Sequence, residues 1–412
     1  MSYAEREGLR PKGNVPTLRF PEFQGEWEKF TFDEIAQYKK GPFGSALKKD
    51  IFVPQSEDTI KVYEQQNAIK KDWTLSRYYI TKGYFNSHMK QFVAKVGDLI
   101  VSCAGTIGEI YELPQDAEEG VFNQALMRVQ VNDEAVNKEI FITVFSSMID
   151  KFSKIYSNGS AIKNIPPFAD LKKTQVFLPC KEEQKKIAKL LALLDERIAT
   201  QSKIIEDLKK LKSAISKLLF AQKPNGWNRL DTLFSKGKAG GTPTSTNKEY
   251  YNGEIPFLSI NDITKQGKYV RCTENYLSQS GLENSSAWVV PKYSLIMSMY
   301  ASVGLVTINE KPLATSQAMF AMQLKDKNLL DYLYYYLSYF KYRHIHKYLE
   351  TGTQSNINAD IVRGIMIPTY GYRHNIEIAS TLQGVDAKID NELSVLEQLH
   401  RQKNYFLSQM FI

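Results

Sequence analysis

Two long stretches of the chain carry apolar residues at alternating spacings of four and three, which is typical of a helix with one narrow apolar stripe. They cover residues 181–222 and 372–412. Both follow the 3.5-residue period of a coiled coil, and polar residues interrupt both at equivalent places. The seam predicted for the first helix consists of Ile187, Leu191, Leu194, Ile198, Ile205, Leu208 and Ile215. The seam predicted for the second consists of Ile378, Leu382, Val385, Ile389, Leu396, Leu399 and Phe406.

Each of these helices must pack against another part of the protein, because a lone helix with an exposed apolar stripe is unstable in water. One interpretation is that each helix packs back on its own domain. The other is that the two helices pair as a coiled coil, for which they have the same length and period. The sides of the first helix are densely charged, and this favours a narrow seam over burial on several sides.

Shorter apolar runs alternate with turn signals in the two segments that precede the helices, residues 27–180 and 223–371. One amphipathic helix is predicted in each, over residues 139–156 and 328–348. Aromatic residues at helical spacing line both, and we interpret them as core, with a base-stacking surface as the alternative. Strands are predicted at residues 92–96, 98–102, 288–290 and 295–299. Together with an N-terminal segment, residues 1–26, this describes two α+β domains alternating with two long helices.

The two halves of the chain repeat each other in order, which indicates an internal duplication. Trp27 matches Trp227, and the last forty residues of each half match at an offset of 191. Three further blocks match between these ends: 96–108 with 292–304, 123–125 with 316–318, and 158–160 with 351–353. A duplicated chain of this kind is expected to have pseudo-twofold symmetry.

Composition narrows the class of protein. The chain of 412 residues is 43% hydrophobic and 24% charged, which is typical of a globular protein, and its formal net charge is +8. The basic excess suggests a polyanionic partner. Three widely separated cysteines argue against a disulfide scaffold and a cysteine zinc site. Without an apolar leader or a run long enough to cross a membrane, a cytoplasmic location is expected.

Basic and hydroxyl residues gather in a glycine-containing loop near the start of each domain. Such loops suit phosphate contact through backbone N–H groups and charge. Solvated surface loops are the alternative, but the equivalent position in both halves favours the functional interpretation. The residues predicted to contact DNA are Lys39, Lys40, Ser45, Lys48 and Lys49 in the first loop, and Lys236, Lys238, Thr242, Thr244 and Ser245 in the second.

Catalytic and metal sites are not predicted. The run Asn164-Ile-Pro-Pro-Phe168 is close to the Asn-Pro-Pro-Tyr/Phe motif of adenine methyltransferases, but Ile165 would displace the acceptor from the prolines, so we interpret the run as a turn. His344 and His346 are two residues apart, which on a helix points them away from each other and argues against a shared metal.

Several stretches, taken in order, resemble the specificity (S) subunit of type I restriction–modification systems. The resemblance covers nearly the whole chain. Arg373-His-Asn375 departs from it, because Glu-Gln would be expected there. The stretches that carry it are residues 14–27, Ser102–Gly108, Asn123–Ala125, Gly159–Ile165, Pro179–Ala188 and Gly240–Asp262.

This resemblance implies a DNA-binding protein that is not itself an enzyme. Residues 27–180 and 223–371 would be target recognition domains, each reading one half of a split site in double-stranded DNA. The helices would pair antiparallel, hold the half-sites apart, and carry two methylation subunits, with restriction subunits joining for cleavage. The chain would bind no cofactor or metal, since S-adenosylmethionine, ATP and Mg²⁺ would belong to the partners. A DNA-modifying enzyme with its own active site and a coiled-coil scaffold without a DNA role are the alternatives.

Overall fold

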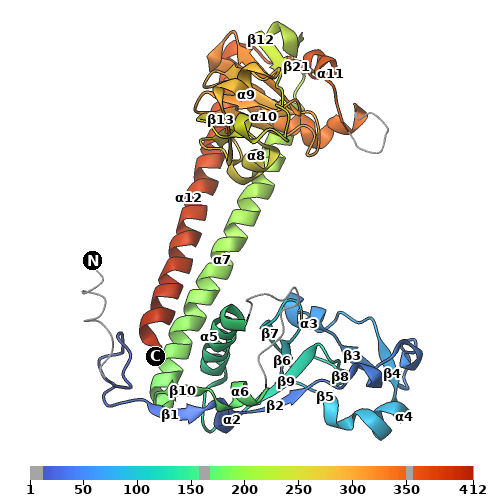
Figure 1. Ribbon diagram of the computed structural model, residues 1–412, viewed down its shortest axis with the longest axis vertical. Helices are drawn as coiled ribbons and strands as arrows, with labels where there is room; N and C mark the ends of the chain where they lie inside the picture. The colour runs from blue at the N-terminus through green and yellow to red at the C-terminus, as the bar shows by residue number, and fades with distance from the viewer. Residues whose placement is uncertain (1–12, 157–167, 349–355, 412) are drawn as a thin grey trace. The chain divides into compact units, whose positions relative to one another are not determined.

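The computed structural model describes residues 13–156, 168–348 and 356–411 (Figure 1). The chain divides into two compact units. Unit 1 comprises residues up to Ala199 together with the stretch from Glu397 onwards, and unit 2 runs from Thr200 to Leu396. Each unit therefore holds one sheet-containing domain and a part of both long helices.

Three sheets form the domain of unit 1. The first pairs β1 (Glu28–Thr31) with β10 (Gln175–Leu178). The second is antiparallel, in the order β2 (Ala36–Lys40), β9 (Leu126–Val131), β6 (Leu99–Ser102) and β7 (Ile110–Glu112). The third has the order β4 (Tyr79–Thr81), β3 (Thr59–Tyr63), β8 (Gly120–Phe122) and β5 (Val93–Ala94), with β3 and β8 parallel. The helices are α2 (Phe32–Ile35), η1 (Gly44–Ala46), η2 (Lys49–Ile51), α3 (Gln65–Lys70), α4 (Lys82–Tyr84), η3 (Phe85–Met89), η4 (Lys90–Phe92), α5 (Lys138–Tyr156), α6 (Phe168–Lys173) and the long α7 (Lys181–Phe220).

The domain of unit 2 repeats this topology. Its first sheet pairs β11 (Gly226–Arg229) with β21 (Met366–Thr369). Its second has the order β12 (Phe234–Ala239), β20 (Met319–Leu324), β17 (Leu295–Ser298), β18 (Val306–Asn309) and an additional β14 (Tyr269–Val270). Its third has the order β15 (Asn275–Leu277), β13 (Ile255–Leu258), β19 (Leu313–Thr315) and β16 (Val289–Val290), with β13 and β19 parallel. The helices are η5 (Leu230–Thr232), η6 (Lys248–Tyr251), α8 (Ile260–Gln266), α9 (Gln279–Glu283), η7 (Lys327–Leu329), α10 (Leu330–Arg343), η8 (Ile345–Lys347), α11 (Ala359–Gly364) and the long α12 (Tyr372–Met410).

This equivalence of strand order confirms the predicted duplication. The four predicted strands are present as β5, β6, β16 and β17. The predicted helix of the second domain is shorter than expected, because α10 ends at Arg343 and a separate 3₁₀ turn follows.

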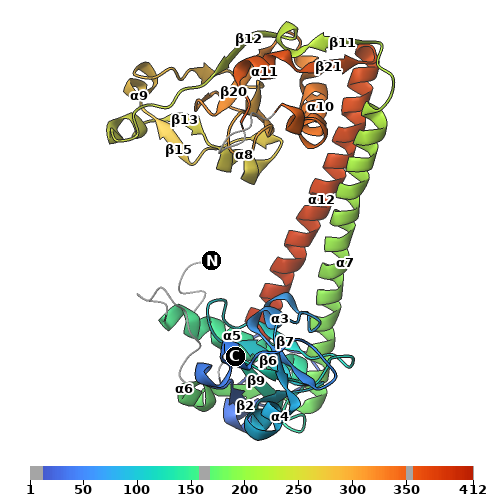
Figure 2. The same ribbon diagram turned by 90° about the vertical axis from the view of Figure 1, so that its right-hand side faces the viewer.

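The aromatic stripes of α5 and α10 are core, as predicted. Phe141 and Phe145 on α5 are fully buried, with ring centroids 5.1 Å apart. On α10, Tyr332 and Tyr336 are buried against Phe220, the last residue of α7. In Figure 2, α10 lies beside the start of α12. Tyr342 is the exception on this helix, with 79% of its surface exposed.

The two long helices pack together antiparallel within each unit. In unit 1, Lys403 of α12 forms an ion pair with Asp195 of α7. In unit 2, Lys212 of α7 contacts Asp386 of α12 at 2.5 Å. Later residues of α7 thus meet earlier residues of α12, which is the predicted antiparallel arrangement.

Burial of the predicted seam varies along each helix. Ile187 and Leu191 belong to the core of the first domain, and Ile378 and Leu382 to that of the second. The helices therefore pair with each other and also pack on the domains, so both interpretations of the apolar stripe hold. The buried seam residues are Ile187, Leu191, Leu194, Ile205, Ile378, Leu382, Ile389 and Leu399. The partly buried ones are Ile198, Leu208, Ile215, Val385, Leu396 and Phe406.

A buried amide side chain anchors the start of each long helix. Gln184 accepts a hydrogen bond from the backbone N–H of Asn137 at 2.7 Å and donates to the carbonyl oxygen of Pro179 at 2.9 Å. At the equivalent place in α12, Asn375 accepts from the backbone N–H of Tyr370 at 2.9 Å. The departure of residues 373–375 from the expected sequence thus preserves the anchor.

Candidate nucleic-acid interface

Three loops converge in each domain, and we call this arrangement the three-loop cluster. In unit 1 they are residues 41–49 after β2, 102–108 after β6, and 123–125 before β9. The backbone N–H of Gly41 donates to Leu126 at 2.9 Å, and that of Cys103 donates to Ala125 at 2.8 Å.

Unit 2 repeats this cluster with its own three loops. They are residues 240–248, 298–304 and 316–318. Gly240 donates to Met319 at 3.1 Å, and Met299 donates to Ala318 at 2.7 Å. The cluster is therefore part of the duplicated scaffold.

A glycine opens the basic loop in both domains because the neighbouring loop leaves no space for a side chain. A Cβ atom on Gly41 would lie 1.9 Å from the carbonyl oxygen of Asn123. A Cβ atom on Gly240 would lie 1.9 Å from that of Thr315. Both contacts are with backbone, which cannot move aside. The chain can therefore pass close to Asn123 in the loop before β9, and to Thr315 at the end of β19, only because a glycine stands there.

The middle loop has the same internal geometry in both domains. The hydroxyl of Ser102 accepts from the backbone N–H of Glu109 at 2.9 Å, and that of Ser298 accepts from Leu305 at 2.9 Å. Within the loop, Gly105 has φ +67° and Ala301, its equivalent, has φ +53°. A left-handed conformation is unusual for alanine, so the loop geometry is maintained in spite of its cost.

Cys103 in this cluster is not a nucleophile. The side chain is 4% exposed, and burial raises the pKa of its thiol to about 12. The thiol therefore stays protonated near neutral pH, and only a thiolate attacks efficiently.

The residues predicted to contact DNA in the first domain differ in their exposure and in whether they already have a partner within the protein. Lys40, Ser45, Lys48 and Lys49 are exposed. Lys39 is only partly exposed, donates to the Oε1 atom of Gln91 at 2.9 Å, and lies 5.1 Å from the centroid of a phenylalanine ring. The exposed lysines are thus the better candidates for phosphate contact.

The polar residues predicted in the second domain are all exposed, but two have partners within it. The ammonium of Lys236 lies 4.3 Å from the ring centroid of Trp288. The hydroxyl of Thr242 donates to the side-chain oxygen of Gln317. Because its proton is already donated, Thr242 is a weaker phosphate donor than its sequence position suggests. The exposed residues are Lys236, Lys238, Thr242, Thr244 and Ser245.

Sequence reasoning missed three exposed side chains of the clusters. Gln124 and Gln317 occupy equivalent positions and are both exposed. Amide side chains are suited to read adenine in the major groove. Phe43, in the first basic loop, is 89% exposed. Two sequence features could have revealed these residues. Gln124 and Gln317 lie in the matching runs Asn-Gln-Ala and Ser-Gln-Ala, and Phe43 lies between Gly41 and Gly44.

Two predictions concern residues for which the structure gives little or no account. The run Asn164–Phe168 and the matched blocks at 158–160 and 351–353 lie outside the described residues, apart from the backbone of Phe168. His344 caps the C-terminus of α10 and His346 lies in the 3₁₀ turn η8, so the two histidines are not on one continuous helix as the argument assumed. Among the described residues, no three His, Cys, Asp or Glu side chains form a group that could hold a metal. Within the same residues no helix is long and apolar enough to span a membrane.

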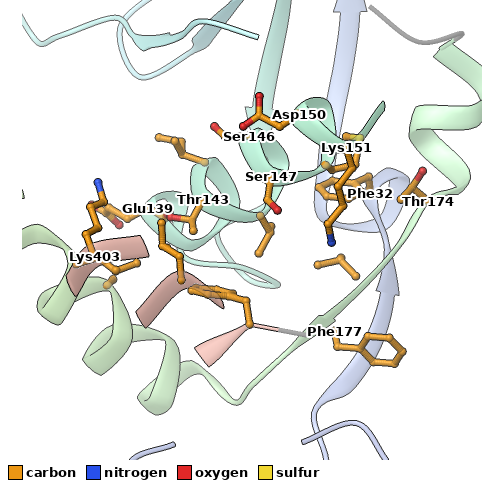
Figure 3. A pocket seen from close by; sticks show the side chains of 18 of the residues that line it. Phe32, Glu139, Thr143, Ser146, Ser147, Asp150, Lys151, Thr174, Phe177 and Lys403 are labelled. Atoms are coloured by element: carbon orange, nitrogen blue, oxygen red, sulfur yellow. The ribbon is translucent and has the colours of Figure 1, made fainter. Parts of the chain in front are cut away.

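A groove of about 950 Å³ lies between α5 and the long helices of unit 1 (Figure 3). Thr143 and Ser147 of α5 line it, as do Asp195 of α7 and Lys403 of α12. None of its lining residues belongs to the three-loop cluster.

The equivalent groove of unit 2 is smaller, at about 230 Å³. There Tyr335 and Tyr339 stand where α5 has Thr143 and Ser147, and the hydroxyl of Tyr335 donates to Asp386 at 2.7 Å. The duplicated scaffold therefore carries one open groove and one that tyrosines fill.

Comparison with known proteins identifies the family. Residues 24–210 and 224–401 match the Type I restriction modification DNA specificity domain. The MjaIX specificity subunit of Methanocaldococcus jannaschii is 26% identical over 178 residues, which is 41% of this chain and 40% of the relative. This match thus spans less than half of that relative.

Two further matches cover nearly the whole chain. The MjaVIII specificity subunit of the same organism is 21% identical and covers 95% of this chain and 92% of the relative. A chain from a solved structure on assembly and conformational transition of a type I restriction–modification system has a TM-score of 0.61 at 18% identity, covering 93% of this chain and 97% of that one. With both halves matched to one family description, the chain belongs to the type I restriction modification DNA specificity family.

Proposed function

We propose that this chain is the DNA-reading subunit of a type I restriction–modification complex. The observation that carries the proposal is the three-loop cluster, which occurs once in each of two domains of the same topology, with exposed lysines in or next to its first loop each time. Two equivalent recognition surfaces on one chain suit a DNA site in two halves. Residues 27–180 would read one half and residues 223–371 the other.

The helix pair acts in this proposal as the spacer between the half-sites. Its two ends are anchored in the domain cores through Leu191 and Leu382, so a change in helix length would be transmitted to the domains. Because the chain is duplicated, it also presents two equivalent faces for partner subunits, and a ratio of two methylation subunits to one chain follows from pseudo-twofold symmetry. Restriction subunits would complete the complex.

Catalysis belongs to the partner subunits in this proposal. The family description concerns DNA specificity, and the one cysteine of the first three-loop cluster is buried and protonated. S-adenosylmethionine, ATP and Mg²⁺ would be bound by the methylation and restriction subunits. A DNA-modifying enzyme and a DNA-independent scaffold are the two alternatives that the test must separate.

The test is to map methylated adenines in DNA from cells that express this chain with its methylation subunits. We expect one bipartite sequence to be methylated, and we expect methylation to disappear when the chain is deleted. Methylation by the purified chain alone, with S-adenosylmethionine added, would indicate an enzyme. Failure of the reconstituted complex to shift the mapped sequence in a gel would indicate a scaffold.

The matched control exchanges residues 27–180 for the same segment of another family member. One half of the methylated sequence should change while the other half and the spacer stay the same. A change in both halves would contradict independent reading by the two domains.

A further inference from the structure

Phe43 is the most exposed of the large hydrophobic side chains that the structure describes, with 89% of its surface accessible. It lies in the basic loop of the first three-loop cluster, between β2 and η1. Leaving a phenylalanine in water is unfavourable, and a single exposed apolar residue needs no special explanation by itself. The structure around Phe43, however, indicates a specific role for its exposed ring.

The loop holds Phe43 from both sides. Before it, Gly41 crosses the neighbouring loop at the close contact with Asn123, and Pro42 is buried. After it, Leu47 is 8% exposed and belongs to a core cluster that includes Val62. The projecting ring is therefore carried by an anchored turn.

Hydrogen bonds fix the turn itself. The backbone N–H of Ala46 donates to the carbonyl oxygen of Phe43 at 2.9 Å, and the hydroxyl of Tyr84 donates to the carbonyl oxygen of Ala46 at 2.8 Å. Binding through such a preorganised turn costs little conformational entropy.

Exposed lysines flank Phe43 in the sequence, with Lys40 before it and Lys48 and Lys49 after it. Lys40, Lys48 and Lys49 are all exposed, and within the described residues none of them forms an ion pair. Exposed lysines that flank a residue in this way are suited to contact the phosphate backbone next to it. An exposed apolar side chain flanked by lysines that can contact phosphates matches the wedges that unstack base steps.

We propose that Phe43 inserts between two base pairs of the half-site read by the first domain and unstacks that step. The inference rests on the proposed function and adds to it a distortion of the DNA. It also makes the two domains unequal, because Thr242 stands at the equivalent place in the second loop and its hydroxyl is bonded to Gln317. The second half-site should therefore be read without a wedge.

The experiment uses the chain in complex with its methylation subunits, without S-adenosylmethionine, on a duplex that carries the mapped site. 2-Aminopurine replaces single bases through each half-site, and its fluorescence rises where stacking is disrupted. We expect one unstacked step in the first half-site, absent in Phe43→Ala and retained in Phe43→Leu, which keeps an apolar wedge. Affinity of Phe43→Ala should fall on the order of tenfold, as for the removal of one base-stacking aromatic.

Two control variants separate a wedge from other roles. Tyr342→Ala, which removes an exposed aromatic ring outside both three-loop clusters, should leave the signal unchanged in both half-sites. Lys40→Ala should weaken binding but keep the unstacked step at saturating protein. Any signal from a target adenine turned out by a methylation subunit should persist in all variants, which serves as the internal reference.

The proposal is overturned if Phe43→Ala, with an unchanged melting temperature, shows the same fluorescence pattern as the parent chain. It is also overturned if affinity falls while the pattern is unchanged, because Phe43 would then contact a groove, for instance a thymine methyl group. If the parent complex does not bind the mapped site at all, the proposed function fails instead.

Discussion

Gln201 of α7 donates a hydrogen bond from Nε2 to the carbonyl oxygen of Glu392 of α12 at 3.0 Å, and Glu392 is the residue that matches Gln201 in the second half of the chain. A residue that contacts its own equivalent lies on a pseudo-twofold axis. The ion pairs Asp195–Lys403 and Lys212–Asp386 are also equivalent. Asp195 matches Asp386 in the second half of the chain, and Lys212 matches Lys403. The two long helices thus contact each other through matching residues in both units.

Removing the side chain of Gln201 should weaken the helix pair in a pH-dependent way. Hydrogen bonds from Lys388 and then Gln201 hold the pKa of Glu392 below its usual value. A lowered folded-state pKa contributes stability that is present above the unfolded value near 4.5 and is lost as pH falls through the folded value. Gln201→Ala removes hydrogen bonds to both the carbonyl oxygen and the carboxylate of Glu392, so it should lower the free energy of unfolding at pH 7 and lower it less at acidic pH.

Urea unfolding at several pH values measures this effect. Lys388→Ala is the control, because it should reduce the pH dependence more than Gln201→Ala does, in keeping with its larger effect on the pKa of Glu392. Equal losses of stability at neutral and at acidic pH for Gln201→Ala would show that the bond to the carboxylate contributes nothing.

The exposed lysines in and next to the first basic loop, Lys40 at the end of β2 and Lys48 and Lys49 in the loop, should contribute to DNA affinity independently of sequence. Replacing Lys40, Lys48 and Lys49 by alanine should reduce the slope of log K against log salt by about 0.9 for each phosphate that a lysine no longer neutralises. Lys39→Ala should have a smaller effect, since its ammonium is bonded to Gln91. Titrations of specific and unrelated duplexes at several salt concentrations test this, and an unchanged slope in the triple variant would mean that the loop is only solvated surface.

Filling the groove of unit 1 with larger side chains should raise the melting temperature of the protein. Thr143→Tyr with Ser147→Tyr copies the residues that stand at these positions on α10, where Tyr335 is bonded to Asp386. The new hydroxyl at position 143 can donate to Asp195 in the same way, and the added rings bury apolar area. Overpacking costs about 1–3 kcal/mol when space is lacking. A fall in melting temperature would therefore show that the groove has no room for the two added rings.

The helix pair should act as a ruler for the spacer. Adding one heptad after Ile205 and one after Leu396 preserves both seams and lengthens each helix by about 10 Å. At about 3.4 Å per base pair, the preferred spacer should grow by about three base pairs with unchanged half-sites. Those base pairs also rotate one half-site by roughly 100°, so binding should weaken even on the best spacer.

A selection from duplexes with fixed half-sites and variable spacers reads out this change. The control variant carries the same seven residues in α7 alone, which offsets the two helices and should abolish tight binding to any spacer. A folded double variant that still binds its methylation subunits and prefers the original spacer would contradict the ruler.

The sequence pattern by itself was sufficient to predict the long helices and the duplication, whereas their antiparallel pairing was implied by the family resemblance. Their signals are local or repeated: a seam such as Ile187–Leu191–Leu194 is read within a few turns, and a match such as Asp195 with Asp386 needs only a constant offset. The core role of Phe141 and Phe145 followed from helical spacing for the same reason.

The tertiary structure alone decided which side chains reach the candidate interface. Gly41, Cys103 and Gln124 lie far apart in the chain, and backbone hydrogen bonds between strands bring their loops together. The exposure of Phe43 depends on anchors at Asn123 and Tyr84, and the bonded hydroxyl of Thr242 depends on Gln317. Periodicity reports which face of an element is buried, whereas the surroundings of a loop side chain are set by long-range contacts that no local pattern contains.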